Sequence, residues 1–166
     1  MKKYITDYVR FNLWANTRLV EVFKQQDDVL ISKHIQSSFP SVRETMMHLW
    51  DVEVLWLARL QGQSPTVFPS KSFTGSNTEL FDNLLDASKN FVTFVEKQPA
   101  TYFTTTEINY KTIKLDGVFV NKPYEMMWHC MNHQSFHRGQ LVMFARQLGI
   151  TTIPSTDFII YLREQK

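Results

Sequence analysis

Four long stretches of the sequence carry apolar residues at the three- and four-residue spacing of a helix. They run from Ile5 to Gln26, from Ser41 to Gly62, from Thr78 to Gln98 and from about Asn121 to Leu148. Each such helix has an apolar face that must be buried against a partner, and four of them account for most of the 166 residues. The pattern therefore predicts an all-α protein, an antiparallel four-helix bundle.

Several residues at the ends of these stretches are typical of helix boundaries. Ser41 and Glu44 have the spacing of a capping box, and Gly62 and Gly149 follow the last apolar residues of their stretches. Gly139 lies inside the fourth stretch, where glycine costs roughly 1 kcal/mol relative to alanine. We expect close packing of a neighbouring helix to explain Gly139.

The segments between the predicted helices differ in character. Gln63–Asn77 is rich in Ser, Pro and Gly and reads as a long loop, a kind of segment that is often functional. Residues 102–120 are rich in Thr, Tyr, Ile and Phe and contain Asp116-Gly117, which predicts a short β-hairpin before the last long helix. A short helix is expected at Thr156–Arg163. No composition break divides the chain, so residues 1–166 are expected to form a single domain.

Charge and composition argue against two classes of partner. The formal net charge is +2 and no stripe of Lys and Arg appears, which disfavours a nucleic-acid surface. No uncharged apolar run approaches the ~20 residues of a membrane span, and the amino terminus has no apolar signal segment. Cys130, the single cysteine, cannot form an internal disulfide and is expected to be a buried, inert thiol. We expect a cytoplasmic protein.

Histidines in the fourth and second stretches suggest a metal site. His129, His133 and His137 follow one another at four-residue spacing, so His133 and His137 can direct two imidazoles at one ion. His48, in the second stretch, is the best candidate for a third ligand. Three neutral imidazoles with an open fourth position are typical of a catalytic zinc-type site. His129 is expected at its edge, since each four-residue step rotates about 40° further around the helix.

His133–Gln140 reads His-Gln-Ser-Phe-His-Arg-Gly-Gln. This run resembles the HxxxHRGQ signature of the DinB/YfiT-like family, the DNA-damage-inducible helical-bundle proteins and not the DNA polymerase that shares the DinB name. Phe11–Asn16 is similar to its amino-terminal aromatic-x-x-W-A-N segment, and His48–Glu53 and Trp56–Gly62 are similar to its second helix. Asp116-Gly117 and Pro154–Phe158 also fit the family's order. The resemblance thus extends over most of the chain.

The resemblance implies a four-helix bundle in which His48, His133 and His137 bind a divalent metal, commonly zinc or nickel. It also implies a bacterial origin and frequent homodimers. Some relatives transfer groups onto low-molecular-weight thiols or isomerise thiol adducts, whereas many have no known activity. The family resemblance therefore indicates the site more sharply than the substrate.

Other polar and aromatic residues each have a functional and an ordinary interpretation. Four of them could orient an imidazole N–H beside the metal: Asp51, Glu53, His129 and Asn132. Four could line a substrate pocket: Trp14, Trp50, Trp56 and Arg138. Roles on the helix surface or in the core are at least as frequent for these residue types, and Arg138 can instead pair with a carboxylate of the second helix.

Three classes of function remain open from the sequence. The first is a metal-dependent transferase that acts on a small thiol and an electrophile, with the metal-activated thiolate as nucleophile. The second, a close variant, is hydrolysis by metal-bound hydroxide with Asp51 or Glu53 as base. The sequence has no HExxH arrangement, which argues against a zincin protease. The third is a non-catalytic metal-binding bundle that serves as a sensor or a dimeric interaction and stress module. A fourth protein ligand would favour that third class, and an open metal site beneath a pocket would favour an enzyme.

Overall fold

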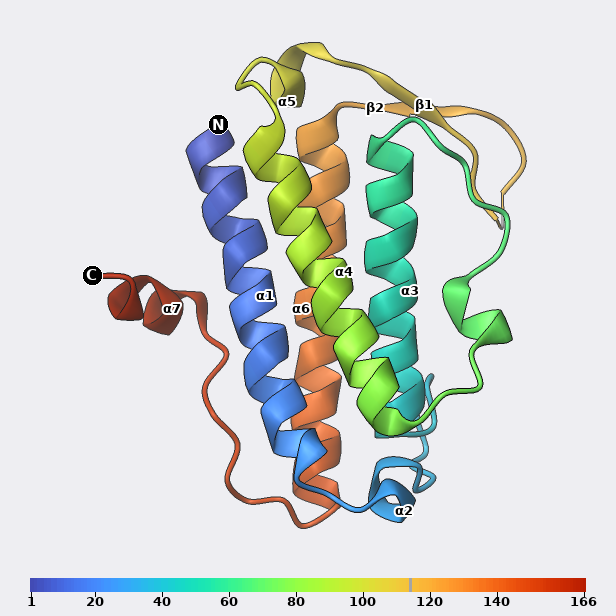
Figure 1. Ribbon diagram of the computed structural model, residues 1–166, viewed down its shortest axis with the longest axis vertical. Helices are drawn as coiled ribbons and strands as arrows, with labels where there is room; N and C mark the ends of the chain where they lie inside the picture. Colours follow the sequence, from blue (N-terminus) through green and yellow to red (C-terminus); the bar gives the residue numbers. More distant parts are fainter. Residues whose placement is uncertain (114) are drawn as a thin grey trace.

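A computed structural model describes residues 1–113 and 115–166 and confirms the bundle of four long helices (Figure 1). These helices are α1 (Lys2–Lys24), α3 (Val42–Leu60), α4 (Asn77–Lys97) and α6 (Pro123–Gln147). Helices α1 and α3 each pack against both α4 and α6. The four apolar faces thus meet in one interior, as the periodicity predicted.

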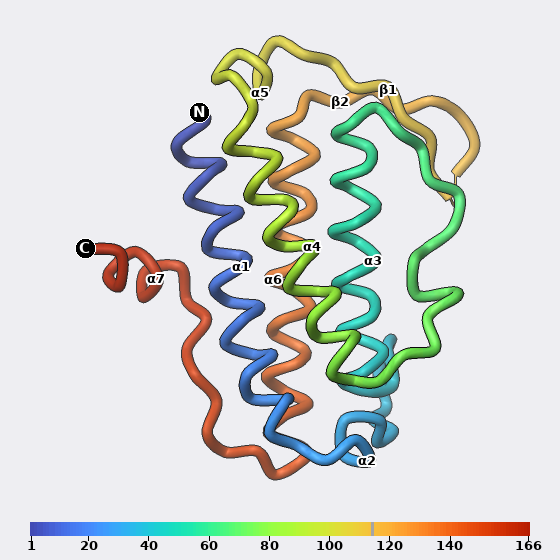
Figure 2. Tube along the Cα trace, in the orientation of Figure 1, coloured from blue at the N-terminus to red at the C-terminus, as the bar shows by residue number. Residues whose placement is uncertain are grey.

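The long connection between α3 and α4 sets the direction of the helices. Residues 61–76, which include the 3₁₀ helix η1 (Pro69–Ser72), return along the side of α3 to the end where that helix began (Figures 1 and 2). Helices α3 and α4 consequently run in the same direction, and α1 and α6 both run in the opposite one. The antiparallel neighbours are α1 with α4 and α3 with α6.

The helix ends have clear local causes. The Ser41 side chain accepts a hydrogen bond from the Glu44 backbone N–H at 3.1 Å, which caps α3 as predicted. The complete reciprocal capping box is at α4, between Ser76 and Glu79, where the sequence interpretation had not placed one. Gly149 follows α6 with φ +84°, a conformation that glycine adopts without steric cost.

Gly139 is exposed on α6, and the expectation of close packing there is wrong. A Cβ atom built at this position would have no neighbouring heavy atom within 4 Å outside the helix's own local backbone. Gly139 therefore lowers the helix propensity of α6 and does not allow a neighbouring helix to pack more closely.

Short elements lie at both ends of the bundle (Figure 1). Strands β1 (Ile108–Tyr110) and β2 (Phe119–Asn121) pair in antiparallel fashion, which confirms the predicted hairpin. Two single-turn helices, α2 (Asp28–Ile31) and α5 (Tyr102–Thr105), were not predicted. They are too short to show helical periodicity in the sequence.

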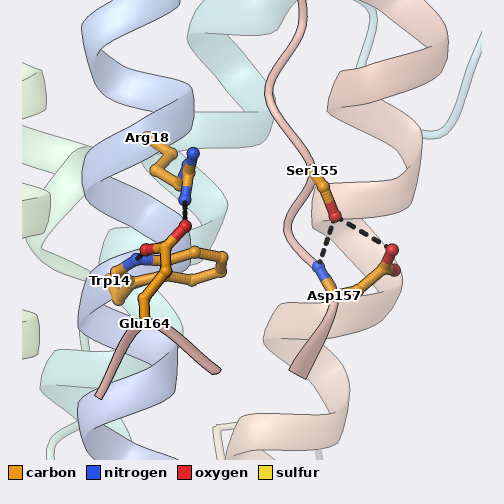
Figure 3. Close-up of polar contacts among 5 residues, drawn as sticks. All are labelled: Trp14, Arg18, Ser155, Asp157 and Glu164. Carbon is orange, nitrogen blue, oxygen red and sulfur yellow. Dashed lines mark hydrogen bonds and ion pairs between the residues drawn. The ribbon is translucent and has the colours of Figure 1, made fainter. Parts of the chain in front are cut away.

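The carboxyl-terminal segment runs back along the outside of the bundle to α7 (Phe158–Glu164), which packs on α1 (Figure 1). The Glu164 carboxylate accepts hydrogen bonds from Trp14 Nε1 at 2.9 Å and from Arg18 at 2.8 Å (Figure 3). Just before α7, the Ser155 hydroxyl accepts a hydrogen bond from the Asp157 backbone N–H (Figure 3). None of the described helices combines the length and apolar character that crossing a bilayer requires.

Candidate metal centre

Three histidines from two helices converge between α3 and α6. His48 comes from α3, and His133 and His137 lie one turn apart on α6. One ring nitrogen from each falls within 4.8 Å of the other two, and His48 Nε2 lies 2.8 Å from His133 Nε2. The structure therefore brings together the three side chains that the sequence predicted as ligands.

Two neighbours fix the orientation of these imidazoles. His137 Nδ1 lies 2.6 Å from Gln140 Oε1, and an amide oxygen can only accept, so Nδ1 carries the proton and Nε2 keeps its lone pair. The His48 ring stacks on Phe39 with centroids 4.2 Å apart. Sequence reasoning missed both residues. The three-residue spacing between His137 and Gln140 could have indicated Gln140, whereas no pattern marks Phe39.

The environment of the histidines favours neutral imidazoles. Burial, followed by the nearby His137 and His129, lowers the pKa of His133 to about 4. Burial also lowers the pKa of His137, against the opposing effect of its hydrogen bond with Gln140. Neutral imidazole is the form that binds a metal, so at pH 7 His133 and His137 are already in the charge state that an ion requires.

The donor set stays at three. Within the part of the chain that the structure describes, no other His, Cys, Asp or Glu joins the group of His48, His133 and His137. Three imidazole nitrogens suit zinc and nickel, and they leave at least one coordination position for water or substrate. The residues present thus fit an open site rather than a closed structural one.

A cleft of about 330 Å³ reaches the site from the side of α3. Its lining residues are Phe39, Glu44, Met47, His48, Asp51, Phe68, Ser70 and Lys71. Asp51 connects α3 to the loop on the other side of the cleft. One of its carboxylate oxygens accepts a hydrogen bond from the Ser70 backbone N–H at 2.8 Å, and the other accepts one from the Ser70 hydroxyl at 2.6 Å. Burial raises the pKa of Asp51, and the bonds from Ser70 oppose that rise. The predicted long loop thus forms the outer wall of the cleft.

Glu53 and Arg138 belong to a buried polar network in the bundle interior. Glu53 Oε1 accepts hydrogen bonds from the side-chain amides of Asn12 at 2.7 Å and Asn16 at 3.0 Å. The oxygens of the same two amides accept from Arg138 Nη1, at 3.1 Å for Asn16. Ser88 donates to the second oxygen of Glu53 at 2.7 Å. Arg138 therefore meets a carboxylate of the second long helix through two asparagines, away from the cleft.

The other predicted site residues are spread over the surface of the bundle. The His129 ring lies 6.0 Å from that of His133 and 4.9 Å from that of Trp56, outside the group of three histidines. Asn132 is exposed, with no side-chain hydrogen bond to any described residue. Trp14 bonds to Glu164, and Trp50 packs edge-on against Phe73. None of the three tryptophans lines the cleft at His48.

A larger cavity of about 730 Å³ lies elsewhere, between α1, α6 and α7. Aromatic rings of Tyr4, Tyr8, Phe11, Trp128 and Phe158 dominate its walls, and no histidine contributes to them. Size alone therefore does not identify the chemically equipped site, which is the smaller cleft at His48.

Comparison with known proteins gives consistent matches. The model of the DinB family matches residues 1–166. Protein DinB of Bacillus subtilis (strain 168) is 22% identical over 173 residues, covering 98% of this chain and 95% of that protein.

Two solved structures share the fold. A DinB-like protein from Bacillus cereus ATCC 10987 has a TM-score of 0.68 at 16% identity, covering 89% of this chain and 94% of the other. YfiT from Bacillus subtilis, described as a probable metal-dependent hydrolase with an unusual four-helix bundle topology, has a TM-score of 0.68 at 11% identity and covers 91% of both chains.

Proposed function

This chain belongs to the DinB family, and on that premise we propose that it is a metal-dependent enzyme that transfers a group from an electrophile to a small thiol. The observation that carries the proposal is the group of His48, His133 and His137, which has no fourth protein ligand among the described residues and reaches a cleft through His48. A closed coordination shell would instead suit a sensor or a structural module.

The three histidines would hold zinc or nickel, the divalent ions that an all-imidazole set suits. A divalent ion bound there would lower the pKa of a substrate thiol and so supply a nucleophile at neutral pH. Gln140 supports the site by holding His137 in the tautomer that exposes Nε2. The Phe39 ring keeps His48 from rotating out of the site.

Neither Cys130 nor Asp51 is a ready nucleophile or base for this site. Cys130 is buried, and burial raises the pKa of its thiol well above the ordinary value, so its thiolate is disfavoured. The Asp51 carboxylate lies in the cleft, but both its oxygens already accept hydrogen bonds from Ser70. Transfer to a substrate thiol needs neither group, which is why we favour it.

Hydrolysis is the second candidate. Asp51 shares the cleft with His48, and the structural neighbour YfiT is described as a probable metal-dependent hydrolase. In this alternative Asp51 would release Ser70 and accept a proton from the attacking water. An Asp51→Asn variant separates the two reactions, because it should abolish hydrolysis and leave thiol transfer largely intact.

The first test is metal content, measured by mass spectrometry on untagged protein after reconstitution with zinc or nickel. We expect about one ion per chain in the wild type, a loss in His133→Ala, and full retention in the matched control His129→Ala. The loaded proteins are then offered small thiols and an aryl halide electrophile, and thioether formation should require His133. Absence of bound metal, or equal turnover by His133→Ala, would contradict the proposal.

A further inference from the structure

Arg59 is a buried cation without an anionic partner. It lies near the end of α3 with 4% of its surface exposed, and its guanidinium carbon lies 4.8 Å above the Trp56 ring and 5.2 Å from the Tyr110 ring. Its buried Nε has no hydrogen-bond partner, and its side chain forms no hydrogen bond or ion pair with any described residue. A buried guanidinium is costly unless it is paired, so this arrangement suits an anion that the chain does not supply.

A third cavity lies where α3, α6 and the hairpin meet, next to the two rings that flank Arg59. Its volume is about 260 Å³ and its lining residues are Trp56, Tyr110, Asn121, Glu125, Met126 and His129. Two of them, Trp56 and Tyr110, are the rings that flank Arg59. The open space thus adjoins the two rings between which the unpaired guanidinium lies.

The one carboxylate in this cavity is already engaged. Glu125 accepts hydrogen bonds from the Asn121 amide at 3.0 Å, the Lys122 backbone N–H at 2.9 Å and the Tyr124 hydroxyl at 3.2 Å. These donors occupy both of its oxygens, and Glu125 forms no hydrogen bond or ion pair with Arg59.

The same protein contains a filled version of this arrangement. Arg18 lies 4.5 Å over the ring of Trp14, and the Glu164 carboxylate accepts one hydrogen bond from each of them (Figure 3). Arg59 and Trp56 repeat that pair one turn apart on α3. The buried Nε of Arg59 has no hydrogen-bond partner among the described residues, in contrast to the paired Arg18.

We propose that Arg59 and Trp56 form a binding site for the carboxylate of a small substrate. His129 lines this cavity, and its ring lies 4.9 Å from that of Trp56 and 6.0 Å from that of His133, one of the three histidines. A thiol at the histidines and a carboxylate at Arg59 would therefore belong to one elongated, carboxylate-bearing thiol. The thiol end of this assignment rests on the proposed function; the carboxylate end rests on Arg59 alone.

Binding of benzoate to the full-length, metal-free protein tests the carboxylate end, with uncharged benzamide as the matched probe. The indole N–H resonances are followed by NMR, and Trp56→Phe identifies that of Trp56. We expect benzoate to shift the Trp56 resonance saturably and benzamide to leave it unchanged. Arg59→Gln should weaken benzoate binding about ten-fold or more, because a charge-assisted pair is lost. The control Arg18→Gln should stay within about two-fold of wild type.

The wild-type measurement decides the proposal even if Arg59→Gln fails to fold. An unresponsive Trp56, an equal response to benzamide, or unchanged affinity in a folded Arg59→Gln protein would overturn it. Because these measurements use metal-free protein, the carboxylate site stands or falls separately from the thiol chemistry. The thiol end is tested on the zinc-loaded protein, where Arg59→Gln should raise KM for a carboxylate-bearing thiol about ten-fold and leave KM for its amide unchanged.

Discussion

Replacing Glu53 by glutamine should change how the stability of this protein depends on pH. Complete burial raises the pKa of Glu53 to about 7, against hydrogen bonds from Ser88, Asn12 and Asn16 and the nearby charge of Arg138. The ordinary value is 4.5. The folded protein therefore binds this proton more tightly than the unfolded chain does.

The sign of the effect follows from this difference. Below pH 4.5 the carboxyl is protonated in both states, and the stability linked to its proton is fully present. That stability is lost as the pH rises from 4.5 to about 7, and above this range the dependence levels off. Since each tenfold difference in proton affinity corresponds to about 1.4 kcal/mol, the total loss is roughly 3 kcal/mol.

Glutamine mimics the protonated carboxyl. Its oxygen can accept from Asn12 and Asn16, and its amide can donate to Ser88, so Glu53→Gln should match the wild type near pH 4.5 and exceed it by roughly 3 kcal/mol at pH 8. Urea unfolding of metal-free protein, followed by circular dichroism across this range, measures the difference. The control is a substitution at an exposed carboxylate, Glu21→Gln, which should change the free energy of unfolding by less than about 0.5 kcal/mol.

A constant difference between Glu53→Gln and the wild type from pH 4.5 to pH 8 would refute this reasoning. A variant that is less stable than the wild type at pH 8 would refute it more directly. That result would mean that Arg138, acting through the two asparagines, keeps Glu53 ionised in the folded protein.

Three further changes have expected outcomes. Gln140→Leu removes the acceptor of His137 Nδ1–H and should weaken metal binding about 10- to 100-fold, measured by competition with a chromophoric chelator. Gly139→Ala should raise the free energy of unfolding by about 1 kcal/mol in urea titrations, because the space for a Cβ is open. Asp51→Ala removes both hydrogen bonds that hold Ser70, so hydrogen exchange at the Ser70 amide should accelerate.

Each of these has a matched comparison. Asn132→Ala, on the exposed face of α6, should leave metal affinity unchanged, and an equal loss there would argue against a specific role for Gln140. A decrease in stability on Gly139→Ala would contradict the open space at that position. Unchanged exchange at Ser70 in Asp51→Ala would mean that other contacts hold η1 in place.

The sequence predicted the long helices well because their signals are local. Apolar periodicity and end residues such as Ser41 and Gly149 act within a few residues, and the observed bounds fall within a few residues of the expected ones. The four-residue spacing of His133 and His137 is equally local. His48 was predicted because a third ligand had to come from another helix, and the family resemblance supported that choice; no local pattern relates it to His133, 85 positions away.

Contacts between side chains on different helices could not be predicted from such local signals. Asn12 bonds to Glu53 across 41 residues and to Arg138 across 126. One signal was present, because Asn12 and Asn16 place two amides one turn apart on the otherwise apolar face of α1. Buried polar groups need partners, so this pair could have indicated a polar network, although the sequence analysis did not use it and it does not identify the other members.

The position of the three histidines also has a consequence for how the chain folds. His48 and His133 are 85 residues apart, and between them lie the long returning loop, α4 and the hairpin. Contacts this distant in sequence form only after a large loss of chain entropy, so the complete group of three histidines belongs to the late stages of folding. An ion that binds only the finished bundle lowers the population of every opened form that separates α3 from α6. Metal supply would then govern the lifetime of the folded protein as well as its chemistry.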